Sequence, residues 1–86
     1  MKSPLRAEAQ ELLREARSAD GELFVLDTQH TGKWVRVGQC NYAEGAEMRH
    51  RYLDALQDLI GAGLVEAAGG VRYELTTPGW EAAKEL

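Results

Sequence analysis

The C-terminal half of the chain limits the possible folds more than any other part. An amphipathic run there ends at Gly63 and Leu64, a pair typical of a Schellman motif, in which a left-handed residue closes a helix. Farther along, the adjacent Gly69 and Gly70 supply the positive φ angles that a tight hairpin turn requires. The pattern therefore predicts a helix that leads directly into a two-residue hairpin.

A short capped helix is predicted after that hairpin. Thr77 can cap this helix, and Pro78 suits its first turn, where no backbone N–H is needed. Trp80, Ala83 and Leu86 then give it a short apolar edge.

The second hairpin strand alternates apolar and polar residues. This period predicts that Val71, Tyr73 and Leu75 face the core. Arg72 and Glu74 would then point outward.

The helix before the hairpin is predicted over residues 45–62. Glu44 and Glu47 near its start complement the positive end of the helix dipole. Its apolar residues recur at helical spacing: Met48, Tyr52, Leu53, Leu56, Leu59 and Ile60.

A first helix is predicted near the N-terminus. Ser3 can cap it, Pro4 suits its first position, and Gly21 is a left-handed stop. Its apolar residues form one stripe: Leu5, Ala9, Leu12, Leu13 and Ala16. The charged residues of its opposite side are expected to be solvated: Arg6, Glu11, Arg14, Glu15 and Arg17.

Between these helices, the apolar runs Leu23–Leu26 and Trp34–Val37 predict a first β-hairpin with a long polar loop. Alternation places Trp34 and Arg36 on one face and the two valines on the other. Because this hairpin is apolar on both faces, we expect each face to be covered, by this domain or by a second chain.

These elements predict a single domain over residues 1–86, of the α+β class. Their order is helix, β-hairpin, helix, β-hairpin, helix, with four strands. A chain of 86 residues has room for one core. Its 44% hydrophobic and 28% charged residues are typical of a folded globular protein.

The stretch from Leu53 to Leu86 resembles the winged helix-turn-helix superfamily of bacteria. The resemblance rests on these residues: Leu56, Leu59, Gly63, Leu64, Val65, Tyr73, Leu75, Thr76, Gly79, Ala83 and Leu86. In that superfamily the pattern forms a recognition helix, a wing and a closing helix. The whole chain also looks similar to small winged-helix modules at the ends of larger bacterial proteins, which is compatible with this sequence being one piece of such a protein.

The span from Leu23 to Tyr42 departs from the winged-helix pattern. A typical winged helix has three helices before its wing, whereas this span predicts a β-hairpin and a loop with no room for a full middle helix. The departure disfavours DNA docking by the usual geometry.

Composition and charge exclude several kinds of site and partner. The 14 acidic and 10 basic residues give a net charge of −4, which counts against nonspecific binding to nucleic acid. Cys40 is the single cysteine, so neither an intrachain disulfide nor a cysteine-built zinc site is possible. The first residues lack the apolar core of a signal peptide, and no long apolar run predicts a membrane span. We expect a cytoplasmic location.

No catalytic or metal constellation is evident, and we expect neither an enzyme nor a bound cofactor. His50 and Asp54 would make an incomplete zinc site. Cys40 has no base nearby in the sequence, which favours a small packing residue over a nucleophile. Thr31-Gly32-Lys33 lacks the first glycine and the helix of a phosphate-binding loop, and no small-molecule substrate is indicated.

Two kinds of binding stay open. The first is a noncatalytic regulatory or protein-interaction module, with a protein partner or self-association through the first hairpin. Trp34 and Arg36 are the candidate contacts there, because tryptophan and arginine dominate interface hot spots. The competing reading of Trp34 is ordinary core packing.

The alternative is a sequence-specific DNA-binding regulator that uses helix 45–62 and a wing over 64–75. His50, Arg51 and Gln57 would project from the helix, and Arg72 near the wing could reach a phosphate. Acidic residues on the same helix face, Glu47, Asp54 and Asp58, would repel DNA, and a mixed-charge solvated face explains the pattern equally well.

Overall fold

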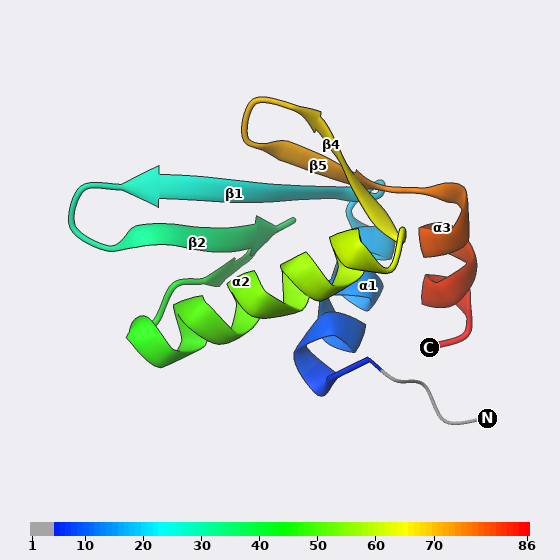
Figure 1. The fold of residues 1–86 in the computed structure, drawn as a ribbon, viewed down its shortest axis with the longest axis horizontal. Helices are drawn as coiled ribbons and strands as arrows, with labels where there is room; N and C mark the ends of the chain where they lie inside the picture. Colours follow the sequence, from blue (N-terminus) through cyan, green and yellow to red (C-terminus); the bar gives the residue numbers. More distant parts are fainter. Residues whose placement is uncertain (1–4) are drawn as a thin grey trace.

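The computed structural model describes residues 5–86, and these form three helices packed against one β-sheet (Figure 1). The elements, in chain order, are α1 (Ala7–Ser18), β1 (Glu22–Thr28), β2 (Gly32–Val37), β3 (Cys40–Tyr42), α2 (Ala46–Gly61), β4 (Val65–Gly69), β5 (Arg72–Leu75) and α3 (Thr77–Lys84). The predicted α+β class is confirmed. The number of strands was wrong, because a fifth strand, β3, follows the first hairpin.

The strands form a single antiparallel sheet in the order β3-β2-β1-β5-β4. The first three strands are a meander, and β5 of the second hairpin pairs with β1. In Figure 1 the turn between β1 and β2 projects away from α1 and α3, while α2 runs below β2. The two predicted hairpins therefore belong to one sheet.

Helix α1 buries four of the five residues of the predicted stripe, and the fifth, Leu5, lies before the helix and is half-buried. Ala9, Leu12, Leu13 and Ala16 have no exposed surface, as one amphipathic face packed on the core requires. The helix begins at Ala7, and the proposed caps Ser3 and Pro4 lie outside the described residues. At its end Gly21 has a φ of 80° and donates its N–H to the Ala16 carbonyl at 2.7 Å, so the predicted glycine stop is confirmed.

Helix α2 closes with the predicted Schellman motif. Gly63 has a φ of 76°, and its N–H bonds to the Ile60 carbonyl at 3.0 Å. Leu64 donates to the Leu59 carbonyl at 2.9 Å, which completes the pair of bonds that defines the motif. The chain thus reverses immediately and enters β4.

The second hairpin turns at Gly69 and Gly70, both with positive φ, as predicted. Leu75 is buried and Tyr73 is half-buried against the core. Val71 is 49% exposed, so its predicted burial was wrong. Its carbonyl accepts the Val25 N–H at 2.9 Å, and its side chain lines a hollow together with Val25 and Tyr73, outside the core.

Helix α3 is capped by Thr76 and not by Thr77 as predicted. The Thr76 hydroxyl accepts a hydrogen bond from the Gly79 N–H at 3.1 Å, and Thr77 is the first helical residue. Ala83 is fully buried and Trp80 is half-buried, whereas Leu86 is 41% exposed and does not extend the apolar edge.

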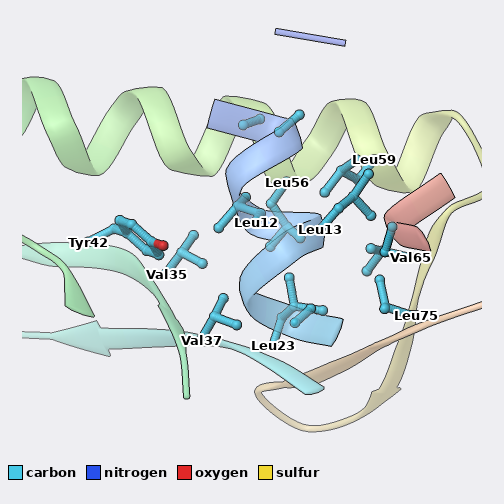
Figure 2. Close-up of a cluster of buried hydrophobic side chains, with 14 residues drawn as sticks. Leu12, Leu13, Leu23, Val35, Val37, Tyr42, Leu56, Leu59, Val65 and Leu75 are labelled. Atoms are coloured by element: carbon cyan, nitrogen blue, oxygen red, sulfur yellow. The ribbon is translucent and has the colours of Figure 1, made fainter. Parts of the chain in front are cut away.

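The core lies between the helices and one face of the sheet (Figure 2). It is entirely apolar apart from the Tyr42 hydroxyl, and its largest members come from all parts of the chain: Leu12, Leu13, Leu23, Val35, Val37, Leu56, Leu59 and Val65. One hydrophobic core therefore joins the N-terminal and C-terminal halves.

Candidate binding surface on the sheet

The two faces of the sheet differ in their cover. On β2, Val35 and Val37 point to the helices and are fully buried, as the alternation predicted. Trp34 and Arg36 therefore point to the opposite side. Cross-strand pairing sets Trp34 beside Leu26 and Arg36 beside Phe24.

We call this opposite side the outer face. It consists of Glu22, Phe24, Leu26, Trp34, Arg36, Glu66, Arg72 and Glu74. None of these residues is buried, although they include the aromatic side chains of Phe24 and Trp34. Phe24, Leu26 and Trp34 neither belong to the hydrophobic core nor pack against it. We conclude that no helix of residues 5–86 covers this side.

A shallow hollow of about 250 Å³ opens on the outer face. It is lined by Ala19, Glu22, Phe24, Leu26, Arg36 and Gly38. Pockets for cofactors and drug-sized ligands are usually about 300–1,000 Å³ and more enclosed. The hollow suits an inserted side chain better than a small molecule.

Three carboxylates cross the outer face in a row. Glu22 lies opposite Glu74, and Glu74 lies opposite Glu66, on three neighbouring strands. Like charges that face each other across strands are destabilising. Arg72 compensates part of this repulsion through a 3.0 Å ion pair with Glu22. No ion pair to Glu66 or Glu74 is found in the described part of the chain.

The residues predicted to project from α2 are exposed. His50, Arg51 and Gln57 all lie on its outward side. Arg51, however, is held 3.1 Å from Glu47 and 3.9 Å from Glu8. The predicted mixed-charge face is therefore present, with its one arginine already engaged by carboxylates.

The candidate contacts fall into two separate sets. Arg72 belongs to the outer face, where it bonds to Glu22 and to the Ala68 carbonyl, at 3.4 Å for the latter. Helix α2 packs on the other face of the sheet, and its exposed residues point away from it. Arg72 thus joins Trp34 and Arg36, while His50, Arg51 and Gln57 stand together on α2.

A polar seam along α1 was missed from the sequence, where Glu11 and Glu15 were expected to be solvated. Glu11 accepts a hydrogen bond from the Tyr52 hydroxyl at 2.8 Å, and Glu15 lies 3.4 Å from the Cys40 thiol. Both carboxylates are half-buried between α1, α2 and β3. Their i,i+4 spacing placed them on one helix side, but nothing in the sequence indicated partners so distant along the chain.

Burial and the neighbouring carboxylates raise the pKa values of the tyrosines in this seam. Burial first, and then the hydrogen bond to Glu11, raise the pKa of Tyr52 to about 12. Burial, and then the neighbouring Glu11 carboxylate, also raise the pKa of Tyr42, whose ring stacks on that of Tyr52 with centroids 4.0 Å apart. Its hydroxyl, which points into the cluster of Figure 2, is buried without a hydrogen-bond partner in the described residues.

The Cys40 thiol is in an unsuitable setting for a nucleophile. Its hydrogen bond to Glu15, and then burial, raise its pKa above the ordinary value. A nucleophilic cysteine requires the opposite, a neighbouring cation or base that favours the thiolate. Within residues 5–86, no three histidine, cysteine or acidic side chains are grouped to hold a metal ion.

Fold and surface together define a class: an α+β domain whose antiparallel sheet carries helices on one face and an open, partly aromatic surface on the other. No helix in the described part of the chain has the length and apolarity needed to cross a bilayer. Comparison of the chain with protein-family models, curated proteins and solved structures finds no match.

Proposed function

We propose that this domain is a noncatalytic protein-binding module that engages its partner through the outer face. The observation that carries this proposal is the group of Phe24, Leu26 and Trp34 on neighbouring strands, each partly exposed on the side of the sheet that faces away from the core. Contiguous exposed apolar surface rimmed by polar residues is typical of interaction sites.

The composition of the face supports the same function. Tryptophan and arginine are the residues most enriched at interface hot spots, and Trp34 and Arg36 lie two residues apart on β2. The hollow beside Phe24 offers room for one side chain of a partner. Such an anchor in a pocket is the usual centre of a binding interface.

We further propose a relationship to winged-helix proteins, within their regulatory and protein-interaction branch. The support is the chain order of α1, β1, α2, the β4–β5 hairpin and α3. In the chain order, the meander strands β2 and β3 occupy the position of the middle helix of a typical winged helix. On this proposal the meander replaced a DNA-docking element and supplied part of the outer face.

DNA binding by α2 and the hairpin is the competing function, and the charges do not favour it. The exposed side of α2 carries Glu47, Asp54 and Asp58 beside a single arginine, Arg51. Arg72, the proposed wing contact, belongs to the outer face. Salt-dependent binding of duplex DNA, weakened by Arg51→Glu, is the result that would reverse this preference.

Site-specific photo-crosslinking tests the protein-binding function. The photoreactive residue p-benzoylphenylalanine replaces Leu26, an apolar residue of the outer face, or Arg14, an exposed residue of α1, in chains expressed in the source cells. We expect a discrete adduct from position 26 only, suppressed by an excess of the unmodified domain. Equal adducts from both positions, or none from position 26, would contradict the function.

A further inference from the structure

We infer that the outer face takes a cationic amphipathic segment of another protein, with its apolar side chains on Phe24, Leu26 and Trp34 and its lysines or arginines over the carboxylate row. This inference rests on the proposed function and names the chemistry of the partner. Two features carry it, namely the uncovered apolar group and the uncompensated charge beside it.

The carboxylate row provides the charge argument. Glu74 lies between Glu22 and Glu66, directly opposite both, so three negative charges are aligned on one side of the sheet. Arg72 pairs with Glu22, at one end of the row. A cation placed over Glu74 and Glu66 relieves a repulsion that the isolated domain retains.

The spacing of the two features fits an amphipathic segment. Glu22, Phe24 and Leu26 alternate along β1, and their side chains share the outer face. The carboxylate row and the Leu26–Trp34 pair are therefore four residues apart along β1, about 13 Å at the rise of a strand. A helix with its side chains is about 10–12 Å in diameter, which is close to this span, so one helix can cover both features.

A second copy of this chain is a poorer occupant. Its own outer face has two cations, Arg36 and Arg72, against the same three carboxylates. Arg72 already pairs with Glu22, and the Nε of Arg36 donates to the Gly38 carbonyl at 3.2 Å. Two outer faces in contact would therefore add repulsion between carboxylate rows. The negative charge of the carboxylate row therefore favours a positively charged partner.

Fluorescence anisotropy with designed peptides tests the inference on the whole chain. The probes are a labelled helical peptide of leucine and lysine, a leucine–glutamate counterpart and a serine–lysine counterpart of equal length. We expect the wild-type chain to bind the leucine–lysine peptide and to bind the other two at least about tenfold more weakly, because the site needs both charge and apolar contact.

Paired charge variants locate the binding. Glu66→Gln with Glu74→Gln removes two carboxylates from the row, and Glu44→Gln with Asp54→Asn removes two exposed carboxylates at α2. We expect the first pair to raise the dissociation constant for the leucine–lysine peptide about fivefold to tenfold, since each exposed ion pair contributes up to about 1 kcal/mol. The second pair should change it less than about twofold.

Three results would overturn the inference: equal effects of the two variant pairs, equal binding of the serine–lysine peptide, or no binding of the leucine–lysine peptide. A crosslink from position 26 to a second copy of the chain, or to an acidic partner, would also overturn it while leaving the protein-binding function intact. Loss of the position-26 adduct itself would instead remove the function.

Discussion

Gly79 lies in the first turn of α3, buried against the backbone of Leu64, which connects α2 to β4. A β-carbon at this position would collide with the Leu64 carbonyl oxygen. That carbonyl accepts the Thr76 N–H at 3.0 Å, so it cannot move aside without losing a hydrogen bond. Close approach of two backbone segments, and not a special φ angle, therefore requires glycine here.

Alanine in a helix normally gives a more stable protein than glycine does. At position 79 we expect the opposite effect. We expect Gly79→Ala to lower the free energy of unfolding by about 2 kcal/mol or more. The matched control is Gly61→Ala, in α2, where nothing lies near the added carbon and stability should rise by up to about 1 kcal/mol. Urea unfolding measures both, and parallel changes in the two variants would contradict the packing argument.

Tyr52 makes stability depend on alkaline pH. Its pKa is about 12 in the folded domain, against an ordinary value of about 10. Below pH about 10 the Tyr52 hydroxyl is protonated in the folded and in the unfolded chain, and its full contribution to the free energy of unfolding is present. Between about pH 10 and 12 the unfolded chain loses this proton first, so the free energy of unfolding falls as pH rises.

Tyr52→Phe should reduce this alkaline fall and, at neutral pH, lower stability by about 1–2 kcal/mol through the lost bond to Glu11. Urea titrations at a series of pH values give both quantities. Part of the fall should remain, because the pKa of Tyr42 is also raised. Identical pH profiles for the variant and the wild type would show that the Tyr52 hydroxyl is not held as described.

At the scale of elements, Thr76 joins the end of α2 to the start of α3. Its hydroxyl accepts from the Gly79 N–H and donates to the Gly63 carbonyl at 2.6 Å. Thr76→Val removes both bonds and should cost about 1–2 kcal/mol of unfolding free energy. Thr77→Val, one residue along and without such bonds in the described residues, should change stability by less than about 0.5 kcal/mol in the same assay. Equal losses would place the cap at Thr77, as the sequence suggested.

The elements differ in how well the sequence predicted them. Long helical patterns and the glycines at 63, 69 and 70 carried enough local information, and each was confirmed. Strand β3 has only three residues, too few for an alternating pattern to be recognised. It forms because Gly38, with a φ of 58°, turns the chain back along β2 and lets Tyr42 pack in the core.

At the scale of the molecule, the sequence predicted the β2 residues of the outer face but not its carboxylate row. Alternation correctly separated Trp34 and Arg36 from the two valines of β2. The carboxylate row depends on pairing between β1, β5 and β4, and the register of strands so distant in the chain cannot be read from local pattern. The seam of Glu11 and Tyr52 was missed for the same reason.

An uncovered face should contribute little to stability. We expect Trp34→Thr, which keeps a β-branched residue in β2, to lower the free energy of unfolding by about 1 kcal/mol or less. Leu12→Ala, in the centre of the core, should cost about 2–5 kcal/mol. Urea unfolding of the two variants compares the faces directly. A loss at Trp34 as large as that at Leu12 would mean that the outer face is packed inside the folded domain.

The most direct measurement for the binding face is competition by the Trp34→Thr domain against the photo-crosslink formed at position 26. The variant stays folded on this account but lacks the largest aromatic side chain of the outer face. We predict that suppressing the adduct requires at least about tenfold more of this variant than of the wild-type domain. Suppression at equal concentrations would show that the partner binds without the outer face, and the account of this surface would be wrong.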